Sequence, residues 1–103
     1  MDRLEQLRRF IAASPDEPFP RYALALERKS QGDVPGAAAE LQALLVRKPD
    51  YLAAYLQLGM LLDQQGRMAE AREAFLQGQV QARAQGNQHT LSELTSALEA
   101  LSL

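Results

Sequence analysis

Apolar residues recur every three or four positions in the middle of the chain. One such series is Leu52, Tyr55, Leu58 and Leu62. This spacing places them on one face of a helix, for which Asp50 is the expected N-cap and Gly66 the expected terminator. A second helix is predicted over residues 68–84, with one face formed by Ala71, Phe75 and Gly78.

The same arrangement occurs 34 positions earlier in the chain. Pairs at this offset include Gly32 with Gly66, Ala37 with Ala71, and Leu24 with Leu58. Helices are therefore predicted over residues 18–31 and 34–47, with Gly32 ending the first and Asp33 capping the second. Several matches at one offset in so short a chain indicate a duplicated helical hairpin.

Half units flank the two hairpins. A helix over residues 2–13 has Leu7 and Phe10 in register with residues 41 and 44, so it corresponds to the second half of a preceding repeat. After a turn at Gly86-Asn87, a C-terminal helix over residues 91–101 carries Leu91, Leu94, Leu98 and Leu101. Thr90 and Glu93 have the form of a capping box at its start. We therefore expect one all-α domain, residues 1–103, with about six antiparallel helices: helix 2–13, repeat 18–51, repeat 52–85 and capping helix 91–101.

This pattern resembles the tetratricopeptide repeat family, whose 34-residue hairpins stack into an α-α superhelix. On first helices the family has a large residue, then Leu followed by a small residue, then a large residue, matched here by Tyr55, Leu58-Gly59 and Leu62. On second helices it has Ala, an aromatic and a small residue, matched by Ala71, Phe75 and Gly78. Arg83 replaces the usual closing Pro, and Arg21 and Arg28 occupy positions that are usually large and apolar.

The resemblance implies a concave groove lined by the first helix of each hairpin. Its expected lining is Tyr22, Leu26, Lys29, Ala53, Leu56, Gln57, Met60, Asp63, Ser92 and Ser96, with His89 near the last helix. An apolar strip is expected within this lining, formed by Tyr22, Leu26, Leu56 and Met60. Such a strip suits an amphipathic helix or an extended peptide. Alternatively, a neighbouring helix or self-association buries these residues. Only Lys29 is cationic there, so a groove that grips acidic chaperone tails is not expected.

Composition narrows the function further. The chain has 103 residues, 47% of them hydrophobic, no cysteine, one histidine and a formal charge of −2. Cysteine-based catalysis, disulfides and cysteine-ligated zinc are excluded, and no second histidine accompanies His89 to build a metal site. No signal sequence or membrane-spanning stretch is present, so a cytoplasmic protein is expected. We predict no enzymatic activity, no cofactor and no metal.

Two classes of function remain. The leading hypothesis is a protein–protein interaction module or scaffold that binds an unidentified protein or peptide in the groove. The alternative is a self-assembling repeat unit. A helical repeat that binds RNA is less favoured than either, because the net charge of the chain is negative. Polar residues on the outer faces of both terminal helices favour a capped monomer over a homo-oligomer.

Overall fold

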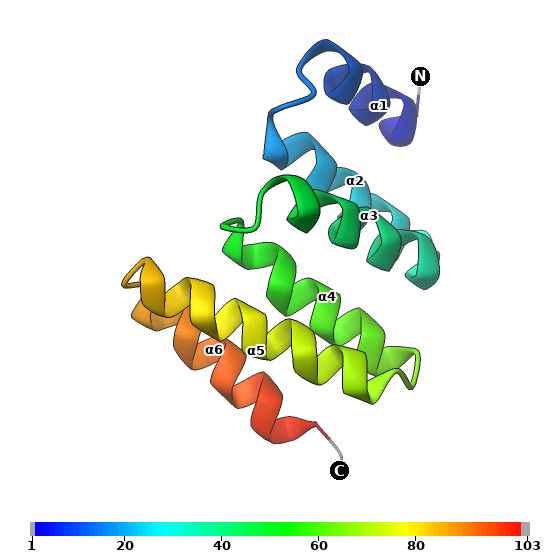
Figure 1. Ribbon diagram of the computed structural model, residues 1–103. Coiled ribbons are helices and arrows are strands. Elements are labelled where there is room, and N and C mark those ends of the chain that lie inside the picture. The colour runs from blue at the N-terminus through cyan, green and yellow to red at the C-terminus, as the bar shows by residue number, and fades with distance from the viewer. Residues whose placement is uncertain (1, 102–103) are drawn as a thin grey trace.

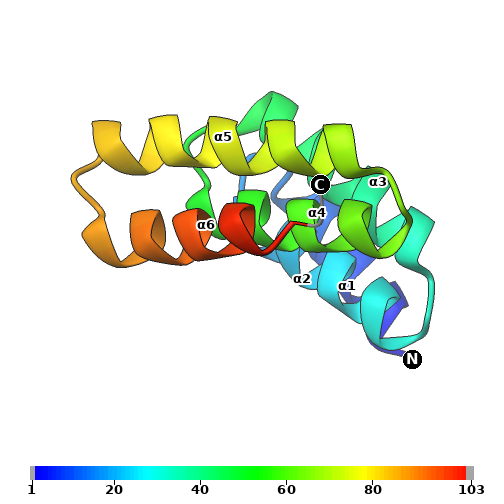
Figure 2. The same ribbon diagram turned by 90° about the horizontal axis from the view of Figure 1, so that it is seen from below.

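The computed structural model describes residues 2–101 and contains six helices in this range (Figure 1). They are α1 (Arg3–Ala13), α2 (Pro18–Ser30), α3 (Val34–Arg47), α4 (Leu52–Gln64), α5 (Met68–Ala84) and α6 (Gln88–Ala100). The predicted all-α class and repeat architecture are confirmed. Figures 1 and 2 together show two layers, with α3 and α5 in one and α2, α4 and α6 in the other.

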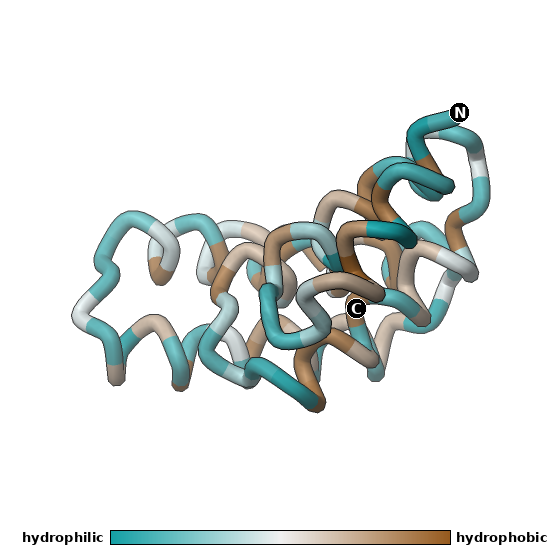
Figure 3. Tube along the Cα trace, turned by 90° about the horizontal axis from the view of Figure 1, so that it is seen from above, coloured by the Kyte–Doolittle hydropathy of each residue, from teal (hydrophilic) through white to brown (hydrophobic). Residues whose placement is uncertain are grey.

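The core lies between the two layers. Its largest fully buried side chains are Leu41, Leu44, Leu61, Leu62, Phe75 and Leu94. Leu7 packs separately with Ala23 and Leu24, which joins α1 to α2. Figure 3 shows many of the hydrophobic stretches in the middle of the stack, where the helices lie close together. Apolar burial of this kind supplies most of the stability of such stacked hairpins.

Three of the connecting turns use a glycine in the left-handed region. Gly32, Gly66 and Gly86 have φ values of 84°, 76° and 66°, a conformation that costs other residues energy. After Gly32, the Asp33 carboxylate accepts a 2.9 Å hydrogen bond from the Gly36 amide and caps α3, as predicted.

Two predicted caps were wrong. Asp50 does not cap α4, because Pro49 and Asp50 lie in a turn and the helix starts one residue later, with Tyr51 as its N-cap. Thr90 is not the N-cap of α6. Asn87 takes that place, and its side chain accepts a 3.0 Å hydrogen bond from the Thr90 amide. Asn is as good an N-cap as Thr or better, and it follows Gly86 directly, so the helix starts earlier.

The small residues at the predicted helix crossings are required by close contact. A β-carbon on Gly59 would overlap the ring of Phe75, and one on Gly78 would lie 2.7 Å from the Tyr55 β-carbon. The distances, 2.2 Å to Phe75 Cε1 and 2.7 Å to the Tyr55 β-carbon, are shorter than any van der Waals contact between carbon atoms. The two glycines therefore set how closely α4 and α5 approach each other.

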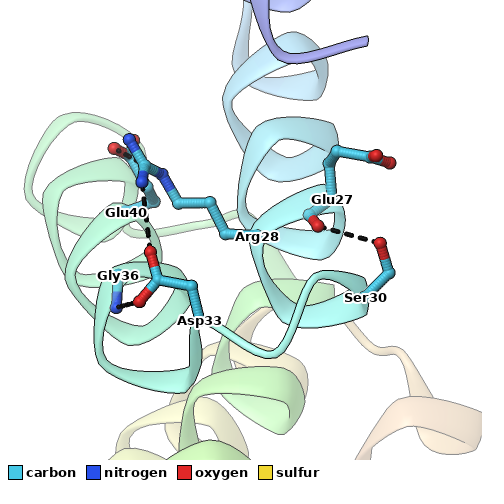
Figure 4. Close-up of polar contacts among 6 residues, drawn as sticks. All are labelled: Glu27, Arg28, Ser30, Asp33, Gly36 and Glu40. Carbon is cyan, nitrogen blue, oxygen red and sulfur yellow. Dashed lines mark hydrogen bonds and ion pairs between the residues drawn. The ribbon is translucent and has the colours of Figure 1, made fainter. Parts of the chain in front are cut away.

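The two arginines at usually apolar positions direct their guanidinium groups to polar partners. Arg21 donates to the Pro15 carbonyl oxygen from Nε at 3.3 Å. Arg28 pairs with Asp33 at 3.2 Å and with Glu40 at 3.5 Å, which links α2 to α3 (Figure 4). Arg28 Nε is buried and makes no hydrogen bond, although it is the atom nearest Glu40. The Arg28 side chain is only 24% exposed, so its aliphatic stem contributes to packing, while its guanidinium forms ion pairs with Asp33 and Glu40.

Because the stem packs and the pairs are partly exposed, Arg28→Met should cost no more than about 1 kcal/mol. Arg28→Ala removes the stem as well and should cost about 1 kcal/mol more than the Met variant. Urea unfolding of both variants measures the difference. Equal losses would mean that the ion pairs, rather than the stem, stabilise this crossing.

Candidate functional site

The face formed by α2, α4 and α6 contains the residues predicted to bind a partner. On its first half, Lys29 Nζ donates a 3.2 Å hydrogen bond to Gln57 Oε1, which ties α2 to α4. Tyr22 lies against Tyr51, with ring centroids 5.3 Å apart and planes tilted by 56°. Tilted aromatic pairs at this distance are favourable. Tyr22, Lys29 and Gln57 are therefore brought together as one surface.

The second half lies between α4 and α6. An open hollow of about 500 Å³ lies here, lined by Leu56, His89, Ser92, Glu93 and Ser96. His89 Nε2 lies 3.5 Å from Glu93 Oε1, and the His89 side chain is largely exposed. Leu56, Ser92 and Ser96 were predicted from the sequence and lie together. Glu93 was not predicted, because it was assigned to the cap of the helix.

The remaining predicted residues lie on α2 and α4 with different exposure. Leu26 is half-buried, whereas Ala53 and Asp63 are exposed. Met60 is 47% exposed. Tyr22 and Leu56 are partly buried against the main core. The apolar strip is therefore narrower than the sequence suggested, with Met60 as its most accessible member.

The three tyrosines of the chain, one in α2 and two at the start of α4, resist ionisation. Burial raises the pKa of Tyr22, an effect that the neighbouring Gln57 side chain partly offsets, and burial also raises the pKa of Tyr51. Tyr55 donates a 2.5 Å hydrogen bond to the Pro49 carbonyl oxygen, and burial together with the charge of Asp50 raises its pKa. In each case the folded state prefers the neutral phenol.

These shifts predict instability in alkali. Each folded-state pKa lies above the ordinary value of 10.0, so the stabilisation is fully present below pH 10 and is lost as the pH rises through the folded-state value. Tyr55→Phe should cost about 1 kcal/mol at pH 7 through its lost hydrogen bond. It should also flatten the decline above pH 10. Urea unfolding from pH 8 to 12 tests this, and an unchanged decline in the variant would assign it to other groups.

A second hollow lies on the opposite side of α4, between α3 and α5. It has a volume of about 430 Å³ and is lined by Gln42, Leu45, Val46, Pro49, Tyr55, Leu58, Leu62, Glu70, Glu73, Ala74 and Gln77. Sequence reasoning missed it because its floor consists of residues already assigned to packing. At its rim, Arg67 pairs with Glu70 at 2.5 Å and lowers the pKa of that carboxyl.

Residues 2–101 contain no group of three or more side chains of the types that hold metal ions. Within the same range, none of the helices combines the length and the apolar character needed to cross a bilayer.

Comparisons with known proteins agree on one family. The sequence profile described as "Tetratricopeptide repeat" matches residues 22–87. A TPR repeat-containing protein of Pseudomonas aeruginosa is 31% identical over 98 residues, which cover 95% of this chain and 93% of that protein.

Two solved structures are similar as well. A tetratricopeptide repeat domain protein from Salinibacter ruber is 37% identical, with a TM-score of 0.76 over 81% of this chain and 92% of that one. Protein BPP2914 from Bordetella parapertussis is 30% identical, with a TM-score of 0.82 over 98% of this chain and 88% of that one.

Proposed function

This chain belongs to the tetratricopeptide repeat family, and we propose that it binds an amphipathic helix or extended peptide on the face formed by α2, α4 and α6. The family fold indicates a protein–protein interaction or scaffold role, and its members are generally non-catalytic. The fold alone does not select a ligand, so the proposal depends on the residues of this face.

One observation carries the proposal. Three helices that are not consecutive in the chain contribute to one surface, joined by the Lys29–Gln57 hydrogen bond on one side of α4 and by the hollow at Leu56 on the other. The accessible Met60 lies on the same helix, and methionine adapts to apolar partners of different shape. Serines and amides beside such an anchor can hydrogen-bond a peptide backbone.

The partner expected here presents one or two apolar side chains with a polar flank. A strongly acidic partner is not favoured, because Lys29 is the one Lys or Arg among the predicted lining residues and it already donates to Gln57. Glu93 and Asp63 make the surface slightly acidic instead. A peptide of neutral or weakly basic character fits this charge best.

A displayed library of random peptides, selected on the wild-type chain, provides a probe. We expect selected peptides to bind Met60→Lys and Ser96→Lys at least about tenfold more weakly, since a charge at a central anchor costs more than about 1.4 kcal/mol. Val46→Lys is the matched control, because Val46 is 85% exposed and lines the opposite hollow.

Amide chemical shifts of the protein with a selected peptide locate the contact directly. Shifts clustered around Gln57, Met60 and Ser92 support the proposal. Peptides that lose binding to Val46→Lys but retain it to Met60→Lys would move the site to the hollow between α3 and α5. Failure to select any peptide would also contradict the proposal.

A further inference from the structure

The two terminal helices are complementary halves of one repeat. By its register, α1 corresponds to the second helix of a hairpin, and α6 corresponds to the first. Within residues 2–101, α1 has no first helix beside it and α6 has no second helix beside it. Each therefore presents a face that a partner helix covers in the complete repeats.

The open face of α1 is visible in the exposure of Phe10. Its equivalent 34 positions later is Leu44, which is fully buried, whereas Phe10 is 61% exposed. A shallow hollow of about 330 Å³ lies beside it, lined by Gln6, Arg9, Phe10 and Ala13. An exposed aromatic ring gains free energy when a partner covers it, so a covering partner is favoured.

The open face of α6 carries the matching residues. Tyr55 and Leu62, which lie under α5 in the complete repeat, are 4% and 1% exposed. Their equivalents 36 positions later, Leu91 and Leu98, are only half-buried. Leu91 comes one residue before Ser92, and Leu98 comes two residues after Ser96. At these spacings the two leucines point to another side of α6 than the serines of the proposed peptide-binding face.

The two ends carry opposite charge. Residues 2–13 contain three arginines and two carboxylates, for a net charge of +1. Residues 88–101 contain Glu93 and Glu99 and no Lys or Arg, for a net charge of −2 with His89 neutral. Attraction between unlike ends favours contact of α1 with α6 over contact of either helix with its own copy.

We propose that α1 of one copy packs against α6 of a second copy as the second helix of a shared repeat. The contact joins two different surfaces, so it continues head to tail and does not close after two copies. It departs from the capped monomer expected from the sequence. The polar residues that suggested a cap are exposed, but those on α1 leave Phe10 61% exposed.

Sedimentation of the full chain over a wide concentration range tests the proposal at low salt. The average mass should rise above the monomer mass of 11.4 kDa with concentration, and added salt should reduce it. Phe10→Glu blocks the α1 end and Leu98→Glu blocks the α6 end, so each variant alone should remain at 11.4 kDa. Mixed in equal amounts, they retain one working contact and should form a pair of twice that mass, 22.8 kDa, and nothing larger.

Circular dichroism confirms that each variant is folded, and Leu91→Glu replaces Leu98→Glu if the latter is not. Val46→Glu is the control for an exposed apolar residue away from both ends, and it should associate like the wild type. The proposal is overturned if the wild type stays at monomer mass throughout, if Leu98→Glu alone still forms pairs, or if the mixture does not. Loss of association in Val46→Glu would also overturn it.

Discussion

Replacing Gly59 with leucine should lower the melting temperature by at least about 12 °C, the equivalent of about 3 kcal/mol in a domain of this size. A β-carbon at this position would lie within 2.5 Å of Phe75 Cδ1 and Cζ. The ring cannot turn away, because Phe75 is 1% exposed and enclosed by the core. Helices α4 and α5 would have to separate, which exposes buried apolar surface along both.

Ala53→Leu is the matched control for this change. It introduces the same side chain on the same helix at an exposed position, so the free energy of unfolding should change by less than about 0.5 kcal/mol. Combining Gly59→Ala with Phe75→Leu should recover part of the loss seen for Gly59→Ala alone, since the two residues touch. A Gly59→Leu protein that melts within 3 °C of the wild type, an interval of well under ~1 kcal/mol, would disprove the close approach.

The fold was predictable because its strongest signals are local or periodic. The duplication at 34 residues places Gly59 and Phe75 at a crossing, and the structure shows them in contact. The helix starts at Asp50 and Thr90 were mispredicted because a capping residue is recognised by type. Asn87 is also of a capping type and takes the place of Thr90, whereas Asp50 lies in a turn, so that α4 starts after Tyr51 without a side-chain cap. Positions of caps depend on one or two backbone angles that a pattern does not determine.

The candidate site was less predictable than the fold. Its residues could be assigned to a face from the register of the helices, which is why Leu56 and Ser96 meet in one hollow. How far each side chain is exposed depends on packing between helices distant in sequence, and Tyr22 proved to be partly buried beside Tyr51. The hollow over Tyr55 and Leu58 was missed for the same reason, since packing residues gave no sign of an opening.

Leu94→Asp should release α6 while the preceding hairpins remain folded. Leu94 is fully buried and lies against Gly78 at the junction of α5 and α6. Removing its side chain and placing a carboxylate there costs more than about 4 kcal/mol, a large part of the total for a domain of this length. Stacked repeats are stabilised mainly by nearest neighbours, and α6 contacts only α5 and α4 extensively, so the loss should stay at this end.

Amide chemical shifts distinguish local from global unfolding in this variant. The thirteen residues of α6 should move to random-coil values, whereas signals from α2, α3 and α4 should stay near those of the wild type. Ser92→Asp adds the same charge at an exposed position of α6 and should leave all signals folded. Collapse of the whole spectrum with Leu94→Asp would show that the two hairpins depend on α6 for their stability. If the α2, α3 and α4 signals are retained, the surface between α2 and α4 forms without α6. Peptide binding at Lys29 and Gln57 could then be measured separately from binding at the hollow beside Leu56.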